Sequence, residues 1–165
     1  MAVATDLTEF VLTKQALCLN DSPDHPFTTS VIEQGTSNSK TVESDADEEL
    51  LIFIPFSQVV RLQSIVVRGP RTNGPKTVHI FAGGRGMSFD DCQHQKATEV
   101  LELSQDQVES GSHVVLDYSL YQKVECVTLF FENNQEDGDV TAVSGVTFFG
   151  VPHGVMNVSE IKKTG

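Results

Sequence analysis

The stretch that decides the fold is RLQSIVVRGPRTNGPKTVHIF, which runs from Arg61 to Phe81. Two apolar runs rich in β-branched residues flank a segment that contains two Gly-Pro pairs. Runs of this kind, bounded by Gly, Pro and Asn, are typical of strands joined by a turn. The stretch therefore predicts two strands and a stiff loop between them, and the loop region carries the basic residues Arg68, Arg71 and Lys76.

The same alternation of apolar runs and turn-forming clusters continues on both sides of this stretch. From Leu50 onward, β-prone runs alternate with turn-forming clusters; the runs are LLIFIPF, VVRLQSIVV, KTVHIF, TEVLEL, HVVLDY, VECVTLFF and VTAVSGVTFFGV. Short strands at this spacing indicate an all-β protein, a sandwich or jelly roll. VECVTLFF is apolar on both faces, which predicts a central strand covered on both sides. HVVLDY alternates, so we expect Val114, Leu116 and Tyr118 to share one face of a strand.

One short helix is predicted among the strands. Ser104 and Gln107 have the spacing of a capping box, and acidic residues follow in the first turns, where the helix dipole favours them. We expect a helical turn from Ser104 to Ser110, ended by Gly111.

A β-bulge is predicted within VVRLQSIVV. Val60 and Leu62 share one parity along the strand, whereas Ile65 and Val67 share the other. A slip of one residue moves side chains to the opposite face of a sheet. We therefore expect an extra residue near Gln63-Ser64.

Length and composition indicate one soluble globular domain over residues 1–165, with 1–16 and 155–165 peripheral or flexible. The net charge of −12 argues against binding to nucleic acid or to anionic membranes. The N-terminus lacks the basic start and apolar core of a signal peptide, and no apolar run approaches the roughly 18 to 20 residues that span a bilayer. We expect a monomeric cytoplasmic protein, with the nucleus left open as a second location.

The cysteines indicate a reducing compartment. Cys18, Cys92 and Cys126 are odd in number and widely spaced, and no C-x-x-C is present. This pattern excludes a disulfide framework, a thioredoxin-like centre and a zinc ribbon.

Charge is distributed unevenly along the chain. Between Leu50 and Phe89 there is no Asp or Glu but there are five cations, and removing this +5 from the net −12 leaves −17 for the remainder; the cations are Arg61, Arg68, Arg71, Lys76 and Arg85. Basic residues on a stiff loop suit docking to an acidic protein surface, because a rigid loop loses less entropy on binding. The alternative is that they pair with the protein's own acidic stretches.

Motifs for catalysis and for cofactor binding are missing. The sequence has no G-x-S-x-G, P-loop or H-E-x-x-H, so we expect no catalytic residues and no cofactor. The acidic run Glu43 to Glu49 lacks the Gly and Glu of an EF-hand, which predicts a solvated turn and no metal. The amides of Asn133, Asn134 and Gln135 are the candidates for an alternative glycan or small-ligand site, although the chain has no Trp and two Tyr to stack on a sugar.

Several motifs together resemble the PITH domain, a family whose name abbreviates proteasome-interacting thioredoxin. They are S-D-x-D-E before an apolar strand, G-P…G-P-K, and F-x-E-x-N-Q, followed by VTFFG near the end. The resemblance covers the chain from Leu17 to the C-terminal MNVSEIKK and implies a jelly-roll β-sandwich of the galactose-binding-like kind. It further implies a non-enzymatic adaptor associated with the regulatory particle of the 26S proteasome. The sequence has no thioredoxin C-G-P-C motif, so it resembles a stand-alone PITH protein without redox activity.

These observations lead to one functional hypothesis and two rivals. We expect a protein-interaction module that docks through Arg68, Arg71 and Lys76, with Arg61 and Arg85 extending the contact. One rival is a glycan or small-ligand module that uses Asn133 to Gln135. The other is a regulatory protein whose partner is unrelated to the proteasome.

Overall fold

The computed structural model describes residues 3–33 and 41–153 of the chain. These residues form an eight-stranded antiparallel sheet and a separate two-stranded sheet. The strands are β1 (Thr5–Asp6), β2 (Leu17–Leu19), β3 (Val42–Glu43), β4 (Leu50–Arg68), β5 (Thr77–Ala82), β6 (Glu99–Glu102), β7 (Val114–Val115), β8 (Val124–Phe131), β9 (Ala142–Val143) and β10 (Gly145–Pro152). The helices are η1 (Thr8–Phe10), η2 (Thr13–Gln15), α1 (Ser30–Glu33), α2 (Phe89–His94), α3 (Gln105–Ser110) and η3 (Tyr118–Leu120).

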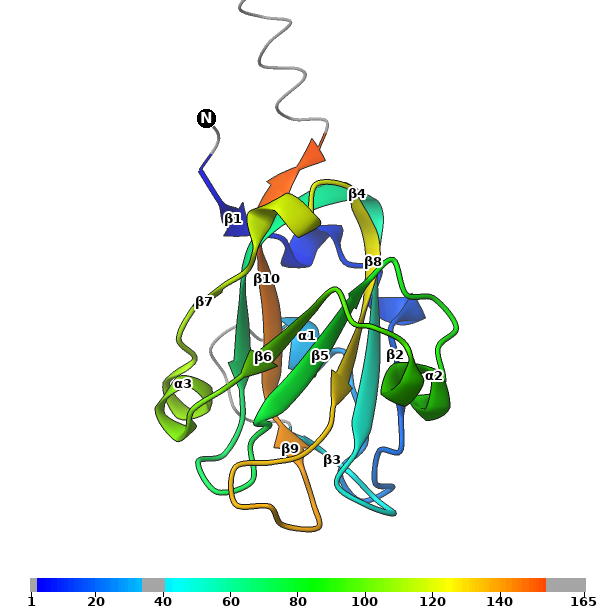
Figure 1. The fold of residues 1–165 in the computed structure, drawn as a ribbon, viewed down its shortest axis with the longest axis vertical. Coiled ribbons are helices and arrows are strands. Elements are labelled where there is room, and N and C mark those ends of the chain that lie inside the picture. The colour runs from blue at the N-terminus through cyan, green and yellow to red at the C-terminus, as the bar shows by residue number, and fades with distance from the viewer. Residues whose placement is uncertain (1–2, 34–40, 154–165) are drawn as a thin grey trace, which may run out of the picture.

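Strand β4 belongs to both layers of the molecule. Its first part pairs with β2 and β8, and its last part pairs with β7 and β10. The register against β8 shifts between Pro55 and Val60, where β4 passes from one layer to the other. The front layer therefore has the order β2-β4-β8-β5-β6 and the back layer β1-β10-β4-β7 (Figure 1). The predicted sandwich is confirmed, but the runs LLIFIPF and VVRLQSIVV are one strand of 19 residues.

The main core fills the space between the two layers. It includes Ile52 and Ile54 of β4, Leu129 of β8 and Phe148 of β10, all at most 3% exposed. A smaller cluster covers the outer face of the front layer, where Cys92 of α2 packs with Leu51, Phe81 and Phe130 of the sheet. Strand β8 is thus covered on both faces, as predicted from VECVTLFF.

The N-terminal segment differs from its expected peripheral position. Strand β1 pairs with β10, and Leu7 is fully buried in the main core. Phe10 and Val11 pack against the same core. The corresponding expectation for residues 155–165 lies outside the described residues.

The predicted bulge lies in β4 opposite β10. Phe149 pairs with Ser64, but the next residue, Gly150, pairs with Leu62. Gln63 is therefore the extra residue, and the parity change in the sequence had predicted its position.

The helix prediction is confirmed at α3 and incomplete elsewhere. Ser104 caps α3 in a capping box with Gln107, and Gly111 ends it in the left-handed conformation at φ 71°. A second capping box begins α2, where Ser88 accepts from the Asp91 N–H. The S-x-x-D signal for α2 was present in the sequence and was missed.

The expectation for HVVLDY is wrong beyond its first residues. Strand β7 ends at Val115, and Tyr118 begins η3 with 40% exposure. Asp117 ends the extended stretch because its carboxylate accepts from the Ser119 N–H and caps the new helix.

Candidate interaction surface

The basic loop 69–76 is held by close backbone approach. The Gly74 N–H donates to the Pro70 carbonyl at 2.7 Å. A Cβ on Gly69 would lie 2.7 Å from the Ala142 oxygen, and one on Gly74 would lie 2.6 Å from the Pro70 oxygen. Only glycine fits at both positions, so the Gly-Pro pairs build a compact loop.

The β8–β9 loop and the first residue of β9 tie this loop to the rest of the fold. Backbone N–H groups of Gln135, Glu136 and Ala142 donate to carbonyls in the basic loop, at 2.9 to 3.1 Å. These bonds hold the basic loop along residues 72–74 and limit its conformational freedom.

The amides of the alternative ligand loop are engaged within the chain. Asn133 accepts from the Thr77 N–H at 2.9 Å. Asn134 is fully buried and donates to the Gly138 carbonyl and to the Thr141 hydroxyl. Gln135 donates from Nε2 to the carbonyls of Pro75 and Leu103. The sequence predicted these amides as candidate ligand contacts and contained no signal that they tie loops together.

Arg71 is paired with acids of its own chain. Its Nη1 lies 2.6 Å from an Asp106 oxygen and 3.3 Å from a Glu109 oxygen, both on α3. The hydrogen bond to Asp106, with the charge of that carboxylate, raises the pKa of Arg71. Arg71 therefore pairs with the protein's own acidic residues, which was the alternative to docking on a partner. All three side chains are largely exposed, so the pairs position the loop more than they stabilise the fold.

Arg68 is held differently from Arg71. Its Nη1 donates to the Ser110 carbonyl at 3.3 Å, and its buried Nε has no hydrogen-bond partner among the described residues. The guanidinium lies against Gly111, where a Cβ would meet its Cζ at 2.3 Å. No described carboxylate forms an ion pair with it.

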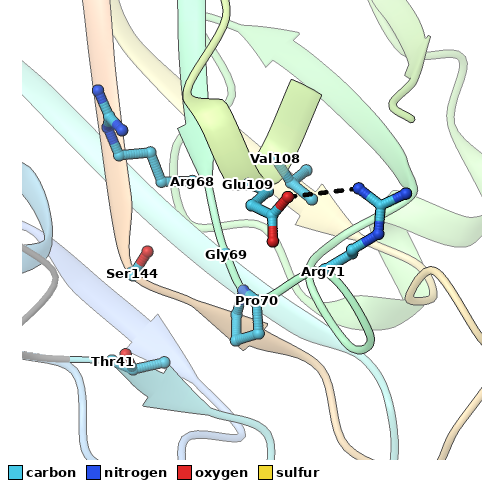
Figure 2. Close-up of a pocket in the computed structure, with 8 residues that line it drawn as sticks. All are labelled: Thr41, Arg68, Gly69, Pro70, Arg71, Val108, Glu109 and Ser144. Carbon is cyan, nitrogen blue, oxygen red and sulfur yellow. Dashed lines mark hydrogen bonds and ion pairs between the residues drawn. The ribbon is translucent and has the colours of Figure 1, made fainter. Parts of the chain in front are cut away.

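A hollow of about 270 Å³ lies between these two arginines. Figure 2 shows Arg71 turned toward Glu109, whereas the Arg68 guanidinium points away from Pro70. We call this feature the arginine hollow; it is lined by Thr41, Arg68, Gly69, Pro70, Arg71, Val108, Glu109 and Ser144. Its walls come from the end of β4, the basic loop, α3 and the turn before β10.

Comparison with known proteins identifies the family of this chain. The family profile described as the PITH domain matches residues 1–164. The chain belongs to the PITH domain family. Thioredoxin-like protein 1 of Schizosaccharomyces pombe is 29% identical over 90% of this chain and 52% of its own length. PITH domain-containing protein CG6153 of Drosophila melanogaster is 33% identical over 76% of this chain and 60% of its own length.

The chain thus spans a little over half the length of these relatives. Among solved structures, the family 32 carbohydrate-binding module of Clostridium perfringens NanJ, in complex with galactose, has a TM-score of 0.64 at 12% identity. That alignment covers 89% of this chain and 99% of the module. The expected galactose-binding-like jelly roll is confirmed, and this likeness concerns the fold alone.

The other predicted contact residues of the PITH domain lie outside the arginine hollow. The Arg85 guanidinium lies 5.3 Å from the Phe53 ring centroid, on the outer face of the front layer. Arg61 is half-buried within β4, and Lys76 precedes β5, its N–H donating to the Asn133 carbonyl. The hollow therefore unites Arg68 and Arg71 but not Arg61, Lys76 or Arg85.

The hollow has a polar wall that no sequence pattern had predicted. Thr41 and Ser144 are far apart in sequence and meet at the hollow, next to the pairing of β3 with β9. No local signal marks them as neighbours of Arg68. In the described part of the chain, no three His, Cys, Asp or Glu side chains are placed to hold a metal ion. None of the described helices has the length and apolar character needed to cross a membrane.

Proposed function

We propose that this PITH domain is a non-enzymatic intracellular interaction module that associates with the regulatory particle of the 26S proteasome. Membership of the family supports a protein-interaction module in general. The contact that we propose is Arg68 at the rim of the arginine hollow, where its guanidinium, turned toward Gly111, meets an acidic side chain of the partner.

The observation that carries this assignment is the different state of the two arginines. Asp106 and Glu109 are engaged by Arg71, whereas Arg68 makes no ion pair with a described residue. Its stem packs beside Gly145, and its guanidinium lies on Gly111. A positioned cation that forms no ion pair within the described part of the chain suits recognition of a carboxylate, because little side-chain entropy remains to be lost.

Docking by Arg68 is favoured over ligand binding by the amide loop. The side chains of Asn133, Asn134 and Gln135 already make hydrogen bonds within the chain. A glycan at these groups would have to replace buried bonds of the loop, which costs free energy before any gain.

The test is co-sedimentation of the purified PITH domain with 26S proteasome and, separately, with its 20S core. Arg68→Glu is compared with Arg85→Glu, which makes the same charge change outside the arginine hollow. We expect binding to 26S only, and a loss of roughly 30-fold or more in affinity for Arg68→Glu, as for removal of one partner of a desolvated charge pair.

Each other outcome removes a defined part of the proposal. Equal weakening by both variants would show that total charge, not the hollow, controls binding. Unchanged binding of Arg68→Glu would exclude the hollow as the contact. Absence of binding to both particles at micromolar concentration and low salt would refute the proteasome association and leave a partner of another kind.

A further inference from the structure

Strand β6 ends the front layer. Among the strands that the structure describes, the order of the sheet ends at β6, and its one pairing partner is β5 (Figure 1). It has four residues, whereas the other terminal strands β1, β2 and β7 have two or three. Its register with β5 is continuous from Glu99 to Glu102, without a bulge.

The backbone of β6 presents unused hydrogen-bonding groups. The N–H of Leu103 donates to the Lys76 carbonyl, so by the alternation of an antiparallel ladder Leu101 is bonded to β5. The N–H and C=O groups of Val100 and Glu102 then point away from β5. They have no hydrogen-bond partner among the residues that the structure describes. We call these groups the free edge of β6.

Two side chains of the free edge lie on the outer face of the sheet, the apolar Val100 and the acidic Glu102. Val100 is paired with His79 on the outer face of the sheet and is 48% exposed. Glu102 lies two residues further along the same face. It is exposed, and its carboxylate accepts a hydrogen bond from the Thr77 hydroxyl. Proteins commonly protect such edges with charged side chains, Pro or a bulge; β6 contains no Lys, Pro or bulge, and its charged residues are Glu99 and Glu102.

The outer face beside β6 is acidic. A hollow of about 500 Å³ over β5 and β8 has Glu48, Glu49, Glu132 and Asp137 in its wall and no Lys or Arg. Burial, together with nearby carboxylates, raises the pKa of Glu49, in agreement with a negative potential there. Lys76 and Lys96 lie near the ends of β6 and offset part of this negative charge. A basic partner is therefore favoured, and the net charge of −12 disfavours a second copy of this chain.

We propose that the free edge of β6 binds an extended basic segment of a partner protein by strand addition. The segment places a β-branched residue beside Val100 and a Lys or Arg beside Glu102, two residues away on the same face. The backbone groups of Val100 and Glu102 form the ladder, and the two side-chain pairs select the sequence. This site is separate from the arginine hollow and does not depend on the proposed proteasome contact.

The test uses two synthetic peptides, acetylated and amidated at their ends, TKTVTKT and TETVTET. Lysines on both sides of the central Val allow either strand direction to place a cation near Glu102. In the intact chain, amide hydrogen exchange of Val100 and Glu102 is followed by NMR. We expect both amides to exchange rapidly in the free protein and about 10-fold more slowly with saturating TKTVTKT. The amide of Leu101 is protected in both states, because it is bonded to β5.

Two variants separate the backbone and charge contributions. Val100→Pro removes an outward N–H that β5 does not use, and we expect it to abolish peptide binding; Val100→Thr is its matched control. Glu102→Lys should reverse the preference, so that TETVTET binds at least 3-fold more tightly than TKTVTKT. This charge reversal keeps the proposal testable even if the proline variant fails to fold.

Three results would overturn the proposal. Peptide-induced shifts that leave Val100 and Glu102 unchanged would place binding elsewhere. Equal affinity for both peptides would remove the selection for a basic segment. Protection of these amides by raising the protein concentration alone, with a dimeric mass, would assign the edge to self-association.

Discussion

Replacing Gly150 with alanine adds a methyl group where the β-bulge brings two strands closest together. Gly150 is in β10, between Thr5 of β1 and Leu62 of β4. A Cβ built on it would lie 1.8 Å from the Arg61 carbonyl oxygen and 3.0 Å from the Leu62 Cα. The obstructing atoms belong to backbone, so a change of rotamer cannot relieve the contact.

The cost follows from the displacement that this contact requires. Carbon and oxygen atoms without a bond between them need more than about 3 Å, so β4 and β10 must separate by more than 1 Å at the bulge. Overpacking of this kind costs about 1 to 3 kcal/mol, and each weakened ladder hydrogen bond adds about 1 kcal/mol. The entropy that alanine removes from the unfolded chain returns only about 0.5 kcal/mol. We expect Gly150→Ala to lower the free energy of unfolding by about 3 kcal/mol.

Urea unfolding followed by circular dichroism measures this loss, with Gly145→Ala as the matched control. Gly145 is in the same strand, but the nearest atom to its added Cβ is Arg68 Cδ at 3.4 Å, an ordinary contact. The control should stay within about 0.5 kcal/mol of the parent, whereas Gly150→Ala should lower Tm by roughly 6 to 12 °C. If the two variants unfold within 0.5 kcal/mol of each other, the bulge is not the close approach described here.

Three further predictions concern buried or acidic groups. Asn134→Ala should cost about 2 to 3 kcal/mol in urea unfolding, because it leaves the Gly138 N–H and other polar groups of the loop unsatisfied; a loss below 0.5 kcal/mol would contradict the structural role of this amide. Burial raises the pKa of Glu49 in the folded state. The native state therefore binds a proton more tightly than the unfolded chain, and the free energy of unfolding falls as pH rises through the folded pKa. The parent should therefore lose stability relative to Glu49→Gln between pH 4 and pH 7, and a difference that does not vary with pH would count against the argument. Burial also raises the pKa of Cys92 to about 11, so iodoacetamide at pH 8 should modify this thiol at least about 100-fold more slowly than free cysteine, as peptide mass spectrometry can measure.

Those features that depend on neighbouring residues could be predicted from the sequence. The capping box at Ser104, the helix end at Gly111 and the parity change around Gln63 each lie within a few residues, and all three are present in the structure. The character of VECVTLFF as a central strand was readable for the same reason, since burial on both faces requires apolar side chains on both. HVVLDY shows the limit of such patterns, because the Asp117 cap outweighs the alternation that continues to Tyr118.

Tertiary structure alone decided which polar groups are free to interact. Arg68 and Arg71 are three residues apart and equally basic in sequence. Arg71 is paired with acids of α3, whereas Arg68 lies on Gly111 and forms no ion pair with a described residue. The amide of Asn134 was a candidate for ligand contact in the sequence, but in the fold it is fully buried. These states depend on strand order and register, which bring together residues more than 30 positions apart. Local propensity contains no information on such pairings, because they form only when the whole sandwich closes around its core.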